Sequence, residues 1–273
     1  MEKINTSKKV DEIFNRIISE KLLDHTCQFF IEKSDGLKPY GSGVFVLIHD
    51  VHFIFTASHV ADALSDNETD LFIKIGIDKY INVVGRVKYT DTDKGNGIDL
   101  AYIKLDKEMI PDLVKDYNFL TIDKIRKHDK LLEGAANYCV LGYPENNFET
   151  DDEELITSAQ AYFTLPTNDN PYKYYKLSKK DWIILKMSGK SQDVETKERL
   201  PMNTHLHGIS GCGLWLLMPN TTDNSYDYRL IGIMTEYRKG KYYCLIGNKI
   251  HLVLAALELF ENMKFKTKIK TDN

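Results

Sequence analysis

Short apolar runs separated by turn-forming residues dominate the first part of the chain after residue 25. The runs are rich in β-branched and aromatic residues, which fit pleated, half-buried strands better than helices. His49 and His52 are expected to flank a hairpin turn at Asp50-Val51. Short strands joined by short turns are typical of an antiparallel barrel. The runs predict six strands: TCQFFIEK, SGVFVLI, HFIFTA, DLFIKIG, INVVGRVKY and LAYIKL.

A second series of apolar runs begins near residue 137 and predicts a second antiparallel barrel. Residues 111–130, which include a short amphipathic piece, are expected to link the two series. The polar residues 188–204 predict a long loop inside the second series. Its strands are expected at the start of the series and near residues 156–163, 181–186, 213–218, 228–234 and 242–246.

Both ends of the chain show helical rather than strand periodicity. Apolar residues recur at helical spacing in residues 7–22, and residues 250–263 form a similar amphipathic pattern. The apolar positions of the first pattern are Val10, Ile13, Ile17, Ile18 and Leu22. The prediction is an all-β protein with two six-stranded antiparallel barrels and a helix at each end. The expected units are an N-terminal helix (1–22), a first barrel with its linker (23–130), a second barrel (131–250), and a C-terminal helix with a basic tail (251–273).

Composition narrows the class of protein. Hydrophobic residues make up 42% of the chain and charged residues 28%, as in ordinary soluble proteins. The net charge of −4 gives no general attraction to nucleic acid, and no apolar run approaches the ~20 residues of a membrane helix. The charged N-terminal residues lack the apolar core of a signal peptide. Four scattered cysteines without CxxC spacing predict free thiols in a reducing compartment, so we expect a cytoplasmic protein that binds neither nucleic acid nor a membrane.

Three polar residues lie where predicted strands meet loops. Ser210 stands between glycines in HGISGCG, His59 ends FTASH, and Asp99 begins the run DLAYIKL. A serine hydroxyl becomes a nucleophile when a histidine takes its proton, and an aspartate can fix the tautomer of that histidine. The three residues therefore predict a catalytic triad. The N–H groups of Gly208 and Ser210 are expected to form the oxyanion hole.

At these residues the chain resembles the trypsin/chymotrypsin-like serine peptidases, and most closely the bacterial trypsin-like branch that includes the HtrA group. The matching motifs are GSGVFV, FTASHV, GIDLAYIKL, GISGCGLW and LIGIMTE, and the resemblance covers residues 23–260. The order His59, Asp99, Ser210 is also that of chymotrypsin. The resemblance implies a chymotrypsin-like double barrel with the active site between the barrels. It also implies a serine endopeptidase that acts on protein or peptide substrates through an acyl-enzyme and needs no cofactor or metal.

Departures from the family pattern bear on regulation. Cys212 and Gly213 replace the Gly-Pro that many bacterial relatives carry after the nucleophile, and Cys212 is expected to be a small buried thiol. Ile209 stands where zymogen-type relatives carry an aspartate that pairs with a newly cut N-terminus, so activation by propeptide cleavage is not expected. A PDZ-like region is not expected after the peptidase. By analogy, we expect an activating protein partner in a bacterial stress-response or phage-defence pathway.

The substrate pocket is expected to be lined by residues before Ser210 and after Gly232. The resemblance places Thr204 at its floor, and because Thr204 is uncharged we expect cleavage after small or medium uncharged residues. Glu236 pointing inward would instead favour basic residues. No further ligands cluster near His205 and His207, so they do not predict a metal site. The candidate pocket residues are Thr204, His205, His207, Thr235, Glu236 and Tyr237.

Two functions from other classes were weighed against the peptidase. A catalytically silent module on the same fold would bind peptides by adding a strand to a sheet edge. The presence of all three triad residue types argues against it. A hydrolase on an α/β-hydrolase sheet would place its acid and histidine after the serine, which is the opposite of the order in this chain.

Overall fold

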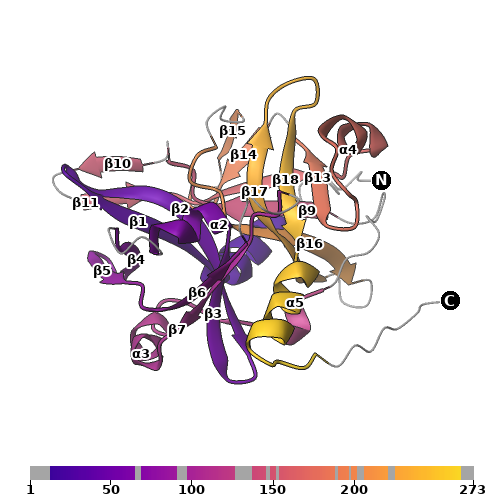
Figure 1. Ribbon diagram of the computed structural model, residues 1–273. Coiled ribbons are helices and arrows are strands. Elements are labelled where there is room, and N and C mark those ends of the chain that lie inside the picture. Colours follow the sequence, from indigo (N-terminus) through magenta and orange to yellow (C-terminus); the bar gives the residue numbers. More distant parts are fainter. Residues whose placement is uncertain are drawn as a thin grey trace.

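Two curled antiparallel sheets lie side by side in the computed structural model, and short helices flank them (Figure 1). The first sheet comes from residues 26–121 and the second from residues 137–249. The structure describes residues 13–64, 69–90, 97–126, 137–145, 148–151, 154–187, 190–196, 198–201, 206–220 and 225–265.

The first sheet has the strand order β5-β4-β1-β2-β3-β7-β6, and β8 pairs with β2 in parallel. The run INVVGRVKY, expected as one strand, forms both β5 and β6, because the chain changes partner between them from β4 to β7. The hairpin turn lies at His49-Asp50, not at Asp50-Val51, and both turn residues have positive φ, of 47° and 62°. The strands are β1 (Thr26–Lys33), β2 (Gly36–Ile48), β3 (Val51–Thr56), β4 (Leu71–Ile75), β5 (Lys79–Asn82), β6 (Gly85–Tyr89), β7 (Ala101–Leu105) and β8 (Leu120–Thr121).

The second sheet has the order β13-β18-β17-β16-β9-β12-β14-β15, and β10 and β11 form a separate pair. The expected loop over residues 188–204 is wrong, because it contains the edge hairpin β14–β15. In its turn Asp193 Oδ1 accepts the N–H groups of Glu195 and Thr196 at 2.9 and 2.8 Å. Within the described residues, each sheet therefore has eight strands, where six were expected. The strands are β9 (Asn137–Gly142), β10 (Phe148–Asp151), β11 (Glu154–Thr157), β12 (Gln160–Thr164), β13 (Trp182–Lys186), β14 (Lys190–Asp193), β15 (Arg199–Pro201), β16 (Gly213–Asn220), β17 (Ser225–Arg238) and β18 (Cys244–Lys249).

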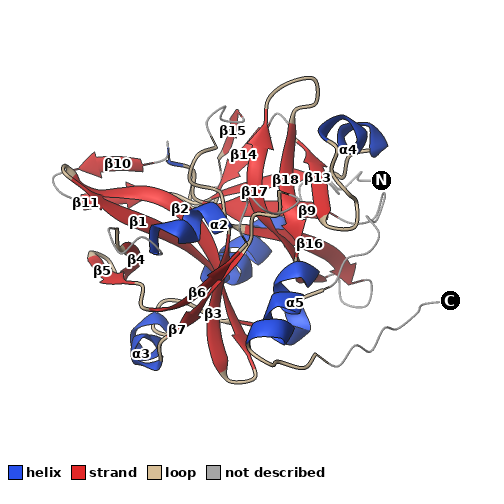
Figure 2. Cartoon of the chain, in the orientation of Figure 1, coloured by secondary structure: helices blue, strands red, loops and turns tan. Residues whose placement is uncertain are grey.

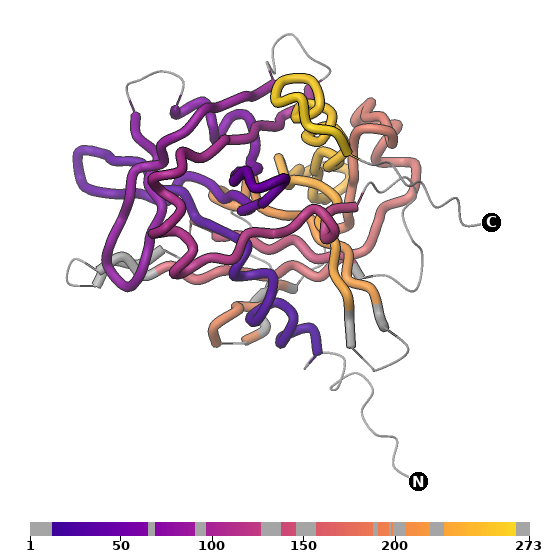
Figure 3. The backbone as a smooth tube through the Cα atoms, turned by 90° about the horizontal axis from the view of Figure 1, so that it is seen from below, coloured from indigo at the N-terminus to yellow at the C-terminus, as the bar shows by residue number. Residues whose placement is uncertain are grey.

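The helices are short and lie around the sheets (Figure 2). Residues 13–22 are helical and lie beside the second sheet (Figure 3). The rings of Phe14, on this helical segment, and Phe163, on β12, are 5.1 Å apart. Sequence periodicity did not indicate α4, although Asn168 caps it by accepting the N–H of Asn170 at 3.1 Å. The α-helices are α2 (Ser58–Ala61), α3 (Ile110–Leu113), α4 (Asp169–Tyr175) and α5 (His251–Phe260), and 3-10 turns lie at Leu23–His25, Asp62–Leu64, Lys107–Met109 and Ile122–Lys124.

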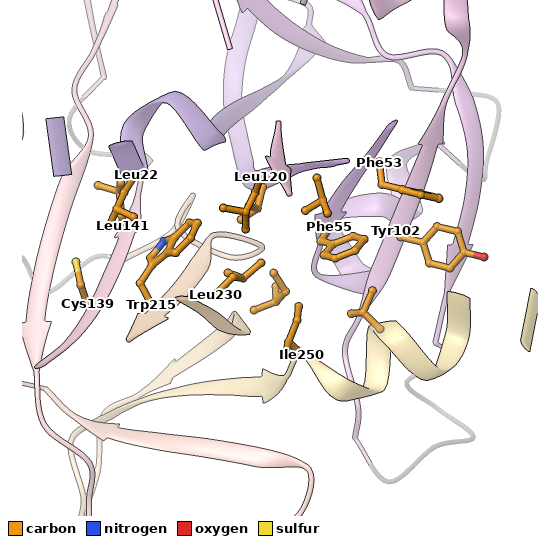
Figure 4. Packing of buried hydrophobic residues seen from close by; sticks show 14 of the residues in the cluster. Leu22, Phe53, Phe55, Tyr102, Leu120, Cys139, Leu141, Trp215, Leu230 and Ile250 are labelled. Carbon is orange, nitrogen blue, oxygen red and sulfur yellow. The ribbon is translucent and has the colours of Figure 1, made fainter. Parts of the chain in front are cut away.

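A shared hydrophobic core joins the two sheets (Figure 4). Phe55 and Tyr102 come from the first sheet, Leu141 and Trp215 from the second, and Ile250 from the start of α5. Each of these side chains is at most 2% exposed, and burying one large apolar side chain contributes about 1.5–3 kcal/mol. This packing brings the end of β3 and the start of β7 close to the loop that precedes β16.

The described residues contain no helix that is long and apolar enough to cross a membrane. All four cysteines are buried as free thiols, as the sequence predicted. Burial raises the pKa of the Cys212 thiol well above its usual range, which keeps this neighbour of Ser210 protonated and poorly reactive.

Candidate active site

His59 and Asp99 form a hydrogen-bonded pair where the two sheets meet. His59 lies on α2, directly after β3, and Asp99 lies two residues before β7. Nδ1 of His59 is 2.7 Å from Oδ2 of Asp99, and the His59 N–H donates to Oδ1 at 3.0 Å. Because the carboxylate contacts both the ring and the backbone of one residue, it favours the tautomer with a proton on Nδ1. That tautomer leaves Nε2 able to accept a proton.

The Asp99 loop is held from both sheets. Oγ1 of Thr90 donates to the carbonyl of Ile98 at 2.6 Å and accepts the N–H of Leu100 at 3.0 Å. From the second sheet, Oδ1 of Asn248 accepts the N–H of Asp99 at 2.9 Å. Asn248 is fully buried, and its Nδ2 has no hydrogen-bond partner within the described residues. An unpaired buried donor costs about 1–3 kcal/mol, so this link between the sheets is made at a cost in stability.

Sequence reasoning missed Asn248. The available signal was a lone amide side chain inside the apolar run CLIGNKI of β18. A buried polar side chain normally needs a partner, but the sequence does not say that this partner is the backbone of Asp99.

Ser42 of β2 holds the loop that carries Ser210. The Ser42 N–H donates to the Ser210 carbonyl at 2.8 Å, and its Oγ donates to the Gly208 carbonyl at 2.8 Å. Its own carbonyl accepts a hydrogen bond from Oγ1 of Thr56 at 2.7 Å. These bonds join the first sheet to the loop before β16. The sequence motif GSGVFV supports the resemblance but does not by itself reveal this role of its serine.

Gly208 and Gly211, on either side of Ser210, have φ values of +90° and +88°, in the region that favours glycine. A Cβ atom on Gly211 would lie 2.1 Å from both the Ser42 carbonyl oxygen and Thr56 Oγ1, so a side chain does not fit there. Within the described residues, the N–H groups of Gly208 and Ser210 donate no hydrogen bond, and both residues line the cleft described below. They are therefore available to an oxyanion bound there.

The Ser210 hydroxyl donates to the Thr235 carbonyl at 3.2 Å. Among the described residues there is no hydrogen bond between this hydroxyl and the His59 ring, although both side chains line one cleft. A serine changes rotamer through a single staggered torsion, and catalytic hydrogen bonds often tighten only when substrate binds. The present rotamer of Ser210 therefore does not exclude a hydrogen bond to His59.

The electrostatic environment of His59 favours its protonated form. Burial lowers the pKa of His59, but the hydrogen bond and charge of Asp99 raise it, and the charges of Asp62 and Glu236 add to that effect. The balance raises the pKa above 6.5. A histidine that is readily protonated suits a base that must stabilise an imidazolium in the transition state.

A cleft of about 480 Å³ lies between the sheets and contains both His59 and Ser210. Four of the expected pocket residues line it, namely His207, Thr235, Glu236 and Tyr237. The β1–β2 hairpin contributes further lining residues, among them Lys33 and Lys38. Thr204 and His205, which were also expected to line the pocket, lie outside the described residues.

Glu236 is neutralised by a neighbour, and Tyr237 faces a histidine. The two carboxylate oxygens of Glu236 accept from Nε and Nη2 of Arg238, both at 2.9 Å. The rings of Tyr237 and His207 are 6.1 Å apart and nearly perpendicular. Both rings belong to residues that line the cleft. The ion pair weakens the attraction of Glu236 for a substrate cation.

Ile209 packs into the core of the second sheet with Leu206 and Cys212. It is 1% exposed, so apolar packing holds the loop that carries Ser210. Within the described residues, no group of three or more His, Cys, Asp or Glu side chains could hold a metal ion.

Comparisons with known proteins support the fold. No family model matches the sequence, and no curated protein matches it either. Among solved structures, the chain is similar to the scabies mite inactivated protease paralogue S-D1, with 11% identity and a TM-score of 0.52. The match covers 89% of this chain and 94% of the mite protein. The fold is therefore the chymotrypsin-like double barrel that the sequence predicted, and identity this low shows the fold alone.

Proposed function

We propose that this chain is a cytoplasmic serine endopeptidase of the bacterial trypsin-like branch. In the proposed mechanism, His59 takes the proton of Ser210, and the serine oxygen attacks the peptide carbonyl. The N–H groups of Gly208 and Ser210 stabilise the resulting oxyanion. His59 then donates its proton to the leaving amine. Water next attacks the acyl carbonyl as His59 takes one of its protons, and His59 returns that proton to the Ser210 oxygen as the acyl group leaves.

The observation that carries this proposal is the contact of Asp99 with both the ring and the backbone of His59, in the cleft that Ser210 also lines. A carboxylate with a purely structural role does not require this geometry, in which the imidazole tautomer is fixed. Ser42 adds support, because it binds the carbonyls of Gly208 and Ser210 on the side of the first sheet.

Two strand edges beside the cleft support a polypeptide substrate. Residues 236–238 of β17 pair with β18 on one side, whereas the pairing of β17 with β16 ends at Ile233. Residues 37–41 of β2 pair with β1, whereas the pairing of β2 with β3 begins only at Val44. Within the described residues, each segment thus has one edge without a strand partner. Such edges bind extended peptides by main-chain hydrogen bonds.

We expect the purified protein to cleave a peptide library after small or medium uncharged residues. Tyr237 and His207 leave little room for a long side chain, and Arg238 compensates the charge of Glu236. Mass spectrometry of the cleaved library gives the preference. The controls are wild type inactivated by a fluorophosphonate probe and Ser210→Ala, both of which should leave the library intact. A dominant Lys/Arg preference that disappears in Glu236→Gln would show that Glu236 binds the substrate cation.

Activity should rise with pH as His59 loses its proton, with a midpoint above 6.5. Asp99→Asn should lower the midpoint, because it removes the largest influence that raises the pKa and leaves the lowering effect of burial. It should also reduce kcat by about 10⁴-fold, because the wrong tautomer is held. Glu236→Gln should give a smaller downward shift. The pH profile of kcat/KM gives the midpoint for the wild type and for both variants. An unchanged midpoint in Asp99→Asn would show that Asp99 does not influence the proton transfer.

A silent peptide-binding module on the same fold is the second candidate. The hydrogen bond from the Ser210 hydroxyl to the Thr235 carbonyl favours it, because in that rotamer the hydroxyl is not bonded to its base. The two candidates differ in the library experiment, since a silent module would bind peptides and cleave none. Regulation by a protein partner fits the peptidase better, because an active cytoplasmic protease needs restraint.

A further inference from the structure

Two lysine- and tyrosine-rich segments, distant in sequence, meet beside the cleft. They are α4 with the turn that follows it, and the loop between β17 and β18 (Figures 1 and 2). The Tyr175 hydroxyl donates to the Tyr242 carbonyl at 2.7 Å, and the rings of Tyr174 and Tyr242 are 5.5 Å apart. We call this junction the basic tyrosine surface, made of the exposed residues Lys173, Tyr174, Lys176, Lys239 and Lys241 and the half-buried Tyr242.

The surface has a strong local excess of positive charge. Residues 169–181 and 236–243 contain seven lysines and arginines against three acidic residues, in a chain whose net charge is −4. Two of those acids are already paired, Asp169 with Lys179 and Glu236 with Arg238. Within the described part of the chain, none of the four lysines of the surface forms an ion pair with a carboxylate, although Lys173 is close enough to Asp169 to lower the pKa of that carboxyl. Clustered ammonium groups without counter-charges attract an acidic ligand.

The surface is continuous with the cleft through the end of β17. Tyr237 lines the cleft, and the Lys239 ammonium lies 5.5 Å from the centre of its ring. Arg238 binds Glu236 of the cleft wall and stacks over the ring of Tyr175 on α4 at 4.7 Å. A ligand that follows the free edge of β17 away from Ser210 therefore reaches the lysines without a gap.

We propose that the polypeptide cut at Ser210 carries an acidic segment that binds the basic tyrosine surface. This inference rests on the peptidase function proposed above. Thr235, whose carbonyl binds the Ser210 hydroxyl, is four residues from Lys239. Four residues of extended chain span roughly 13 Å. In a substrate strand that pairs antiparallel with this edge, the residues before the cut bond lie toward Lys239. The acidic segment therefore begins about four residues before the cut bond.

The ring faces argue for an acidic polypeptide rather than a nucleic acid. Single-stranded nucleic acids bind by stacking bases on open aromatic faces. Here the Lys241 ammonium lies over Tyr174 and Tyr242, at 5.7 and 5.6 Å, and Lys239 covers Tyr237. These cations occupy faces that bases would need, whereas carboxylate side chains can approach the ammonium groups directly.

The test measures binding of labelled ligands to Ser210→Ala protein, which keeps bound peptides intact. Fluorescence anisotropy compares a twelve-residue peptide containing four consecutive glutamates, the same peptide with glutamines, and a twelve-nucleotide single-stranded DNA. The charge reversal Lys239→Glu/Lys241→Glu is compared with Lys21→Glu/Lys107→Glu, which changes net charge equally at exposed sites away from the surface. Thermal unfolding establishes that both variants fold, and Lys239→Gln/Lys241→Gln serves as a milder change.

We expect the glutamate peptide to bind at least about tenfold more tightly than the glutamine peptide, and to lose that advantage only in the Lys239/Lys241 variants. Added salt should weaken the binding. Equal loss in the Lys21/Lys107 control, or no preference for glutamate, would overturn the proposal. Tighter binding of the DNA, lost in the same variants, would assign the surface to a nucleic acid and overturn it as well.

A separate readout distinguishes failure of this inference from failure of the peptidase proposal. Fluorophosphonate labelling of Ser210 in otherwise unchanged protein reports the nucleophile and should be equal in wild type and Lys239→Glu/Lys241→Glu. If Ser210 is labelled but the glutamate peptide is not preferred, the peptidase proposal stands and the proposed acidic segment is ruled out. A glutamate preference without labelling would leave a binding surface and overturn both the peptidase and the claim that the bound segment belongs to its substrate.

Discussion

Ser210→Ala and His59→Ala are each expected to lower kcat by about 10⁶-fold, and the double variant should be little worse than either single one. The reason is that the hydroxyl and the imidazole act in one proton transfer, so removing either removes the whole step. The residual rate should come from the oxyanion hole and substrate binding. Steady-state kinetics on a peptide from the library experiment measures the three variants side by side.

The matched control for this series is Cys212→Ala. Cys212 lies two residues from Ser210, is fully buried and carries a thiol whose pKa is raised by burial. Its replacement should leave kcat within a few-fold of wild type. Additive effects of the Ser210 and His59 changes would contradict a shared proton transfer, and full activity of Ser210→Ala would remove Ser210 from the mechanism.

Gly211→Ala is expected to lower the free energy of unfolding by about 3–5 kcal/mol and to reduce activity at least about 10²-fold in the molecules that remain folded. An alanine Cβ would lie 2.1 Å from the Ser42 carbonyl oxygen and from Thr56 Oγ1, both on the first sheet. The loop and the sheet must therefore separate, and this displaces Ser210. Urea denaturation and kcat measurements test the two effects.

Gly36→Ala separates the clash from the backbone strain. Gly36 has a φ of +104°, comparable with the +88° of Gly211, but nothing lies within 4 Å of its ideal Cβ position. The control should cost only the strain of a positive φ, about 1–2 kcal/mol, with activity unchanged. Equal losses in the two variants would mean that the contact with Ser42 and Thr56 does not determine the fit of the loop.

Local sequence pattern determined much of this protein. Short apolar runs rich in β-branched and aromatic residues predicted most strands of both sheets, and the resemblance carried by the motifs GSGVFV, FTASHV and GISGCGLW implied the double barrel. The pattern also singled out His59, Asp99 and Ser210, because each lies where a predicted strand meets a loop. Their catalytic roles stay predictions until the kinetic experiments are done. These inferences were available because strand periodicity and nucleophile loops depend on neighbouring residues.

The pattern failed where a strand has little apolar signal. β14 and β15 lie in a polar stretch at the edge of the second sheet, and the INVVGRVKY run hides a change of partner between β5 and β6. A strand at the edge of a sheet can consist mostly of polar residues, so it leaves no apolar pattern in the sequence. The strand number of each sheet was therefore decided by pairing rather than by periodicity.

Only the tertiary structure decided how the site is held and what lies beside it. Ser42 is more than 160 residues from Gly208, and Asn248 is 149 residues from Asp99, yet each pair is hydrogen bonded across the sheets. The basic tyrosine surface likewise joins α4 to a loop more than 60 residues away. Contacts between distant segments depend on how the two sheets pack on their shared core, and that packing leaves no period in the sequence that could be read locally.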